Sequence, residues 1–311
     1  VRRTCRLRST TATSFCKQAV GEQTGQSTKR GCPVEEKESG PQARFFVNHF
    51  RNCCVFNVSP AIKDILLQAE KLIENGRRDV AFQLVKTTFQ STDSDPDSVR
   101  KVDRLVLGRK LAELHPLWWQ NLGNSSLCLR RTRASDVAFY KEIFSNEDWA
   151  RRYNRQKPWR GNLEKALERT GQQSPLQSGS LFWVIERPGG RSIGLASLTS
   201  IDQKNQKAEL SLGLLDSHSE VETAKALFWI MQFAFQKIQL NRLYVYIYTD
   251  NAPVRRVLEK FGFELEGTLR DHFYLPPGQF FDVWVMGLNR ADVHNNERIK
   301  KLAARWVGWI I

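Results

Sequence analysis

The sequence predicts an α/β (α+β) protein, in which a mixed, mostly antiparallel sheet is flanked by helices and preceded by a small all-α region. Three observations support this fold class. From Ser126 to Leu288, segments with the alternation of strands are interleaved with segments of helical periodicity. Turns rich in Gly and Pro separate them, as at 188–190. Residues 60–114 show helical periodicity alone.

The composition supports a folded chain with an excess of positive charge. The 311 residues are 41% hydrophobic, which supports a packed core in one large domain or two smaller ones. The net charge is +14, and the first 59 residues hold ten Lys/Arg against four Glu. This excess serves solubility or attracts an acidic partner. No apolar run reaches roughly 18 residues and no nucleic-acid motif is present, so neither a membrane nor a nucleic acid is an expected partner.

Residues 1–59 are predicted to be a disordered basic tail, because 1–44 contain few large apolar groups. Residues 1–20 resemble an organelle transit segment, and an unstructured start is the alternative. Five of the six cysteines fall within the first 54 residues, and none forms a CxxC or a Cys/His set. We therefore expect no metal, a reducing compartment and a cytoplasmic location.

Residues 60–122 are predicted to be a helical region. Pro60 opens a first helix, Asn75-Gly76 ends it, a second follows through Phe89, and a third spans 97–114. The stretch LLQAEKLIENGRRDVAFQLVKTTF resembles one tetratricopeptide-type unit, which implies docking of a protein partner. The alternative is a small helical domain that packs on its neighbour. The apolar patch 117–119 is expected between the two regions.

Residues 123–292 are predicted to form the second domain. Its expected strands cover 126–132, 180–187, 190–201, 207–215, 240–249, 263–274 and 280–288. Its expected helices cover 134–145, 146–153, 161–171, a segment through Phe235, and 251–262. Residues 293–311 form a C-terminal amphipathic helix that ends in exposed-looking Trp306, Trp309, Ile310 and Ile311. We expect that helix to pack on the helical region or on a second subunit.

The segment NAPVRRVLEKFGFELEGTLRDHFYLPPGQFFDVWVMGL, preceded by LNRLYVYIYTD, resembles a known family. It is similar to the C-terminal half of the GNAT superfamily of acyl-CoA-dependent N-acetyltransferases. The similar branch holds ribosomal-protein N-terminal, polyamine and amino-sugar acetyltransferases. The resemblance covers about 126–290 and implies acetyl-CoA as co-substrate and an amine-bearing acceptor, either a protein N-terminus or a small amine.

The resemblance also implies where acetyl-CoA binds. In the family, its pantetheine pairs with the fourth strand beside a splay in the sheet; here that edge is Leu212, Gly213, Leu214 and Leu215. Asn251 matches an asparagine near the thioester, and its alternative role is a helix N-cap. Arg255 and Arg256 could reach the CoA phosphates.

The resemblance implies a base but no acid. Glu209 has the register of the family's general base, and the alternative is a solvated or salt-bridged strand carboxylate. Where many members carry a Ser or Tyr near the thiol, this chain has Val254 and Leu258, which cannot donate a proton, and water could substitute for a side-chain acid.

The family's glycine-rich phosphate loop is replaced by residues 216–223, which contain no Gly and no Arg. Ser219 and Glu222 fit a capping box, in which the helix's own side chains satisfy its free amides. Glu220 and Glu222 would also repel pyrophosphate. The amides of Ser217 and Ser219 could contact a phosphate only if the caps rearranged.

A basic run and two histidines are further candidates for a functional role. The run RRYNRQKPWR (151–160) lies near the acceptor site by resemblance, where it is a solvated charge run or attracts an acidic acceptor. His218 and His272 have no sequence partner that indicates a metal or a nucleophilic triad. The sequence thus predicts an N-acetyltransferase acting on a primary amine of a protein N-terminus, polyamine or amino sugar. The alternative is a catalytically weak or inactive GNAT-like module that acts as an interaction or scaffold protein.

Overall fold

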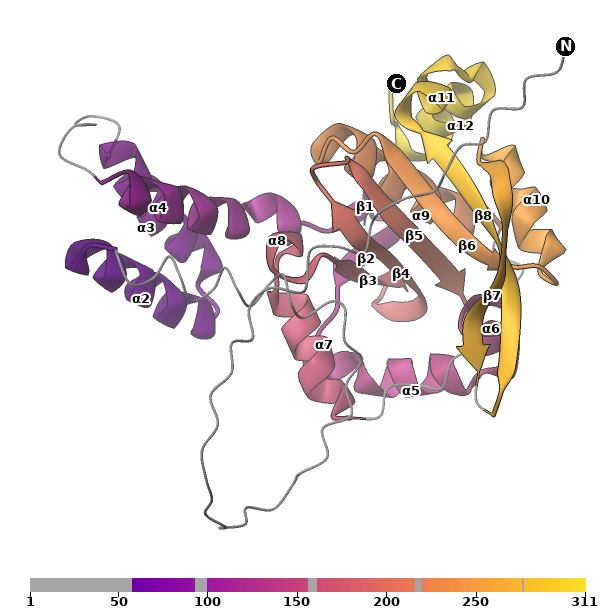
Figure 1. The fold of residues 1–311 in the computed structure, drawn as a ribbon, viewed down its shortest axis with the longest axis horizontal. Coiled ribbons are helices and arrows are strands. Elements are labelled where there is room, and N and C mark those ends of the chain that lie inside the picture. The colour runs from indigo at the N-terminus through magenta and orange to yellow at the C-terminus, as the bar shows by residue number, and fades with distance from the viewer. Residues whose placement is uncertain (1–57, 93–99, 156–160, 216–219, 276) are drawn as a thin grey trace, which may run out of the picture. The chain divides into compact units, whose positions relative to one another are not determined.

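The computed structural model describes residues 58–92, 100–155, 161–215, 220–275 and 277–311 (Figure 1). The predicted basic tail, 1–59, lies outside the described residues except for its last two positions. In the described part of the chain, no helix combines the length and the apolar character that crossing a membrane requires.

Three helices open the described chain: α2 (Pro60–Glu74), α3 (Arg78–Ser91) and α4 (Lys101–Glu113). They lie where the sequence predicts helices. Gly76 adopts φ 73° in the turn between α2 and α3, a conformation that glycine reaches without strain. Ala69 and Ala81 are fully buried, which allows the two helices to approach closely. A tetratricopeptide-type unit and a protein partner for it stay predictions.

A single eight-stranded sheet follows, in the order β1-β2-β3-β4-β5-β6-β8-β7. Only β5 and β6 pair in parallel, and every other neighbouring pair is antiparallel. The predicted mixed, mostly antiparallel sheet is thereby confirmed. The strands are β1 (Leu122–Asn124), β2 (Leu127–Arg131), β3 (Leu181–Arg187), β4 (Arg191–Asp202), β5 (Lys207–Leu214), β6 (Arg242–Tyr248), β7 (Glu264–Leu275) and β8 (Gln279–Asn289).

Helices cover both faces of the sheet, as the alternation along β3 illustrates. Trp183 and Ile185 belong to the main core, which also contains residues of α9 and α12. Val184, between them, belongs to a second cluster with residues of α5 and α7. The remaining helices are α5 (Val137–Ser145), α6 (Glu147–Tyr153), α7 (Leu163–Gln172), α8 (Pro175–Ser178), α9 (Glu220–Gln232), α10 (Ala252–Lys260), α11 (Arg290–Asn295) and α12 (Glu297–Val307).

The C-terminal helix does not pack as the sequence suggested. Trp309 is 1% exposed within the main core, and the ring of Trp306 lies 6.0 Å from that of Phe228 on α9. The expectation that Trp309 is exposed was therefore wrong, and this helix packs on α9, whereas contact with a second subunit stays a prediction. Gly308, at φ 68°, turns the chain after α12 so that Trp309 enters the core, while Ile310 is 85% exposed.

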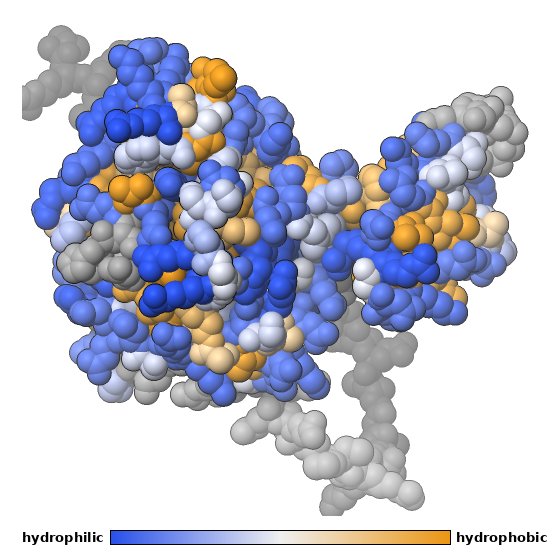
Figure 2. All heavy atoms as spheres, turned by 180° about the vertical axis from the view of Figure 1, so that it is seen from behind, coloured by the Kyte–Doolittle hydropathy of each residue, from blue (hydrophilic) through white to orange (hydrophobic). Residues whose placement is uncertain are grey.

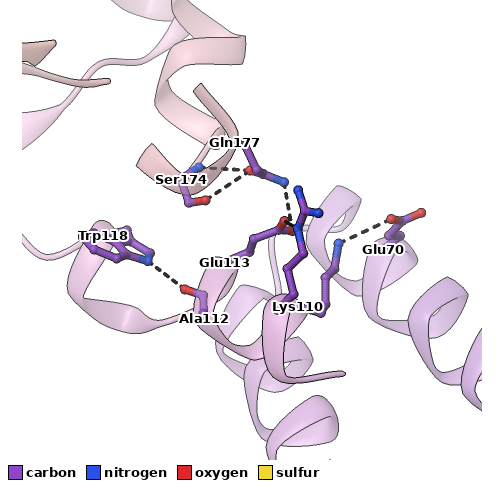
Figure 3. A network of polar contacts seen from close by, with 8 residues as sticks. Glu70, Lys110, Ala112, Glu113, Trp118, Ser174 and Gln177 are labelled. Carbon is purple, nitrogen blue, oxygen red and sulfur yellow. Dashed lines mark hydrogen bonds and ion pairs between the residues drawn. The ribbon is translucent and has the colours of Figure 1, made fainter. Parts of the chain in front are cut away.

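Polar contacts join the helical region to the sheet domain (Figure 3). The Gln177 amide of α8 donates to the Glu113 carboxylate of α4 (3.3 Å). Within the helical region, the Trp118 indole donates to the Ala112 carbonyl (2.8 Å). Because Trp118 is also part of the main core, the expected packing of the 117–119 patch between the two regions is confirmed.

The surface is hydrophilic over most of the face in Figure 2, and hydrophobic atoms emerge in separate patches. Two large apolar side chains of the helical region are exposed to solvent: Leu67 is 53% exposed and Leu105 is 68% exposed.

Candidate functional site

The strands β5 and β6 separate partway along their length. Their parallel pairing joins Lys207–Glu209 to Arg242–Tyr244 and ends there. β5 nevertheless pairs with β4 as far as Leu214, and β6 pairs with β8 as far as Tyr248. Within the described strands, the β6-facing edge of β5 therefore has no strand partner beyond Glu209. An extended ligand that carries amides can pair with such an edge.

The four residues expected at this edge lie at the end of β5. Leu212 is half-buried against the main core, and Gly213 and Leu214 are buried. Leu215 donates its backbone N–H to the Ile193 carbonyl (2.8 Å) and lines a cavity of about 380 Å³ together with Arg187 and Arg191. Contact of these residues with pantetheine stays a prediction.

Helix α6 lies directly over Gly213. A Cβ at this position would stand 2.8 Å from both the Trp149 indole nitrogen and Cγ of Tyr153. Glycine therefore permits the close approach of α6 to β5. Asn146 fixes the start of α6, since its side chain accepts the Trp149 backbone N–H (2.9 Å).

Asn251 holds the other end of α6. It is 7% exposed, and its side-chain amide donates to the Arg152 carbonyl (3.1 Å). Its side chain makes no capping hydrogen bond to α10, so the N-cap alternative was wrong for the side chain. The structure adds a role that the sequence did not indicate, because Asn251 and Arg152 are 99 positions apart. Binding of a ligand amide by Asn251 stays a prediction.

Arg155 follows α6 and packs at the carboxyl end of β6. Its guanidinium lies 4.2 Å from the centre of the Tyr248 ring and forms an ion pair with Asp250 (2.5 Å). Burial raises the pKa of Tyr248, and the Arg155 backbone N–H and charge act in the opposite direction. Within the basic run 151–160, Arg155 is thus engaged with the protein, and 156–160 lie outside the described residues.

Glu209 lies in a row of side chains that crosses three strands. Thr199 of β4 and Tyr244 of β6 are its register partners, so the three side chains share one face. No described ion pair involves Glu209, which is half-buried. Burial raises the pKa of Glu209, and a hydrogen bond from Thr199 limits the rise. A raised carboxyl pKa suits a general base that works near neutral pH.

An aromatic surface extends the row beyond Glu209. The rings of Tyr244 and Tyr246 lie 5.6 Å apart, and His272 lies 4.9 Å from Tyr246. This surface was not predicted, although the alternation in LYVYIY is the signal that places Tyr244, Tyr246 and Tyr248 on one face. His272 could not be found in this way, because a register shift in β7 between Leu269 and Phe273 sets its position.

The phosphate end of the expected site is described only in part. Ser217 and Ser219 lie outside the described residues, so the capping box stays a prediction. The Glu222 carboxylate accepts two hydrogen bonds from Arg187, each 2.6 Å long. That pairing offsets much of the negative charge that the sequence placed at the start of α9.

The two arginines of α10 differ in their surroundings. Arg255 pairs with Glu259 (2.8 Å) and lies 4.8 Å from the centre of the Trp284 ring, whereas Arg256 is exposed. Val254 and Leu258 of the same helix pack against the main core.

Comparisons with known proteins agree with this geometry. A family model described as an acetyltransferase (GNAT) domain matches residues 126–264. The uncharacterized N-acetyltransferase YoaA of Bacillus subtilis is 26% identical over 157 residues, 49% of this chain and 88% of that protein. The spermidine N(1)-acetyltransferase of Vibrio cholerae is 24% identical over 161 residues, 51% of this chain and 91% of that protein.

A solved structure supports the fold. Mycobacterium smegmatis RimJ in complex with CoA-disulfide superimposes with a TM-score of 0.52 at 20% identity, covering 63% of this chain and 99% of RimJ. This likeness shows the fold alone. Residues 126–264 are therefore similar to the acetyltransferase (GNAT) domain family.

Proposed function

We propose that the protein is an N-acetyltransferase that moves an acetyl group from acetyl-CoA to a primary amine. The observation that carries the proposal is the position of Glu209. This half-buried carboxylate stands where β5 and β6 separate, beside the unpaired edge of β5. The family match and the N-acetyltransferase names of the relatives support the same activity.

The residues at the separation fit acetyl-CoA at its pantetheine end. The unpaired edge of β5 from Leu212 to Leu215 would pair with the pantetheine amides, and Arg256 would meet a phosphate. When bound, acetyl-CoA supplies an acetyl group activated as a thioester. Trp149 and Tyr153 of α6 cover Gly213 and would exclude water from this end of the site.

Glu209 would prepare the acceptor for attack. An amine is protonated at neutral pH and cannot attack a carbonyl until it loses a proton. The raised pKa of Glu209 brings its carboxylate closer to the value that such a transfer needs. The hydrophobic packing of Val254 and Leu258 leaves protonation of the leaving thiolate to water. Direct attack needs no covalent intermediate on the enzyme.

Thiol release with a panel of acceptors tests the proposal. The panel contains a peptide with a free N-terminus, spermidine and an amino sugar, each with acetyl-CoA. We expect release with at least one amine, and Glu209→Gln should lower kcat by roughly 10²-fold or more while binding of acetyl-CoA is kept.

Glu264→Gln is the matched control, since Glu264 is an exposed strand carboxylate on β7. If both variants turn over at the wild-type rate, Glu209 is not the base. If the wild type neither binds acetyl-CoA nor releases thiol, the domain is a non-catalytic interaction module instead.

A further inference from the structure

A β-bulge in β4 stands beside Glu209. The pairing of β4 with β5 is regular from Gly194 to Thr199 and then shifts before Asp202. Within this shift, Ser200 adopts φ 50°, a left-handed conformation that residues other than glycine rarely occupy. Strained backbone of this kind is often kept where it positions a functional side chain.

The bulge lies at two consecutive hydroxyl residues, Thr199 and Ser200. In a regular strand, neighbouring side chains point to opposite faces. Thr199 is the register partner of Glu209, and hydrogen bonding by its hydroxyl lowers the pKa of that carboxyl. The Ser200 hydroxyl acts in the same direction on the pKa of the Tyr244 phenol. Glu209 and Tyr244 are themselves register partners across β5 and β6. The bulge therefore supports two neighbouring polar groups at once.

We propose that Glu209 and Tyr244 together receive the acceptor amine, and that Thr199 and Ser200 are the residues that position them. This inference rests on the proposed function. The protonated amine transfers one proton to the Glu209 carboxylate, and the N–H bond breaks as the O–H bond forms. The Tyr244 oxygen accepts a hydrogen bond from a second N–H of the amine and so orients the nitrogen. Tyr244 is then a catalytic residue in contact with substrate, and the two hydroxyls act through their partners.

We expect burial and the Thr199 hydroxyl, not a neighbouring charge, to set the pKa of Glu209. On β6, Tyr244 and Tyr246 face it, and Arg242 is held in an ion pair with Glu266. On β7, His272 lies beyond Tyr246. On the same strand, Lys207 lies on the same face as Glu209 and is the register partner of Asp202 on β4. The groups that α6 places over this face, Trp149 and Tyr153, lie at Gly213.

The pH dependence of kcat/KM tests the role of Thr199. Thr199→Val keeps the shape and removes the donor to the ionised carboxylate, so the pKa of Glu209 should rise further. The acid limb should move up by about 0.5–1 pH unit. Thr199→Ser restores the donor and should restore the profile. Ser197→Ala is the control, because Ser197 is a hydroxyl two residues earlier on the same face of β4.

Two further variants test Tyr244. Tyr244→Phe should raise KM for the amine about tenfold. Ser200→Gly tolerates the left-handed backbone and removes the CH2OH side chain with its hydroxyl, so it should raise the same KM with the fold retained. An unchanged KM in Tyr244→Phe would overturn the role of Tyr244.

A measurement without turnover separates this inference from the proposed function. Infrared titration of the free protein can follow the carboxyl band that Glu209→Gln removes. A higher midpoint in Thr199→Val than in Ser197→Ala supports the positioning role. Coincident midpoints overturn it, even if the enzyme is active. Absence of turnover with a shifted midpoint would instead refute the proposed function and leave the Thr199 contact standing.

Discussion

Replacement of Gly213 by alanine tests how closely β5 and α6 approach each other. The added methyl would stand 2.8 Å from the Trp149 indole nitrogen and 2.8 Å from Cγ of Tyr153. Ordinary van der Waals contact begins at 3.4 Å, so each ring must withdraw by 3.4 − 2.8 = 0.6 Å. Because both rings belong to one helix, α6 must shift as a body. Overpacking of this kind costs about 1–3 kcal/mol.

Thermal unfolding monitored by tryptophan fluorescence measures this cost. For a folded region of this size, the melting temperature should fall by roughly 2–12 °C. Gly267→Ala is the matched control, because a Cβ at Gly267 on β7 meets nothing within 4 Å. The double variant Gly213→Ala/Tyr153→Ala should lose less than the sum of its parts. If Gly213→Ala is as stable as Gly267→Ala, the reasoning about this contact is wrong.

Three other predictions concern charges. Arg130 is 8% exposed and forms ion pairs with Asp136 and Glu186. Arg130→Met should leave these two carboxylates without their partner and lower the free energy of unfolding in urea by about 3–5 kcal/mol. A loss below about 1 kcal/mol would contradict this. Burial raises the pKa of Glu209, so its stabilising contribution is present below about pH 4 and is lost as pH rises through the folded pKa. Glu209→Gln should therefore melt higher than wild type at pH 7 and equally at pH 4, and a lower melting temperature at pH 7 would contradict the sign. Arg256→Ala should weaken acetyl-CoA binding more than Arg255→Ala does in calorimetry, because Arg255 is already paired within α10; the reverse order would contradict that choice.

The larger strands and helices could be predicted because their patterns are local. Alternation along 240–249 and helical spacing along 251–262 are visible in single windows of sequence, and β6 and α10 fall within them. β1 and α8 were not predicted, since three or four residues carry too little periodicity. Burial of Trp309 depends on the left-handed turn at Gly308 and on the complementary surface of α9, which no window of sequence contains.

The candidate site was predictable in part for the same reason. The resemblance implied Glu209 by its register on a recognisable strand, and the structure has Glu209 beside the separation of β5 and β6. The contact of Asn251 with Arg152 joins segments far apart in sequence, and the Ser200 bulge interrupts the very alternation on which strand prediction depends. Both features arise from tertiary packing, so only the structure reveals them.

Binding of acetyl-CoA by the purified protein, followed by calorimetry and by thermal shift, tests the central claim most directly. The sequence of residues 216–223, where the resemblance implies a phosphate loop, argues against tight binding. The separation of β5 and β6 leaves an edge with which pantetheine could pair. We predict a saturable heat of binding and a raised melting temperature, both reduced in Gly213→Ala. No heat and no thermal stabilisation at millimolar acetyl-CoA would contradict the acetyltransferase account.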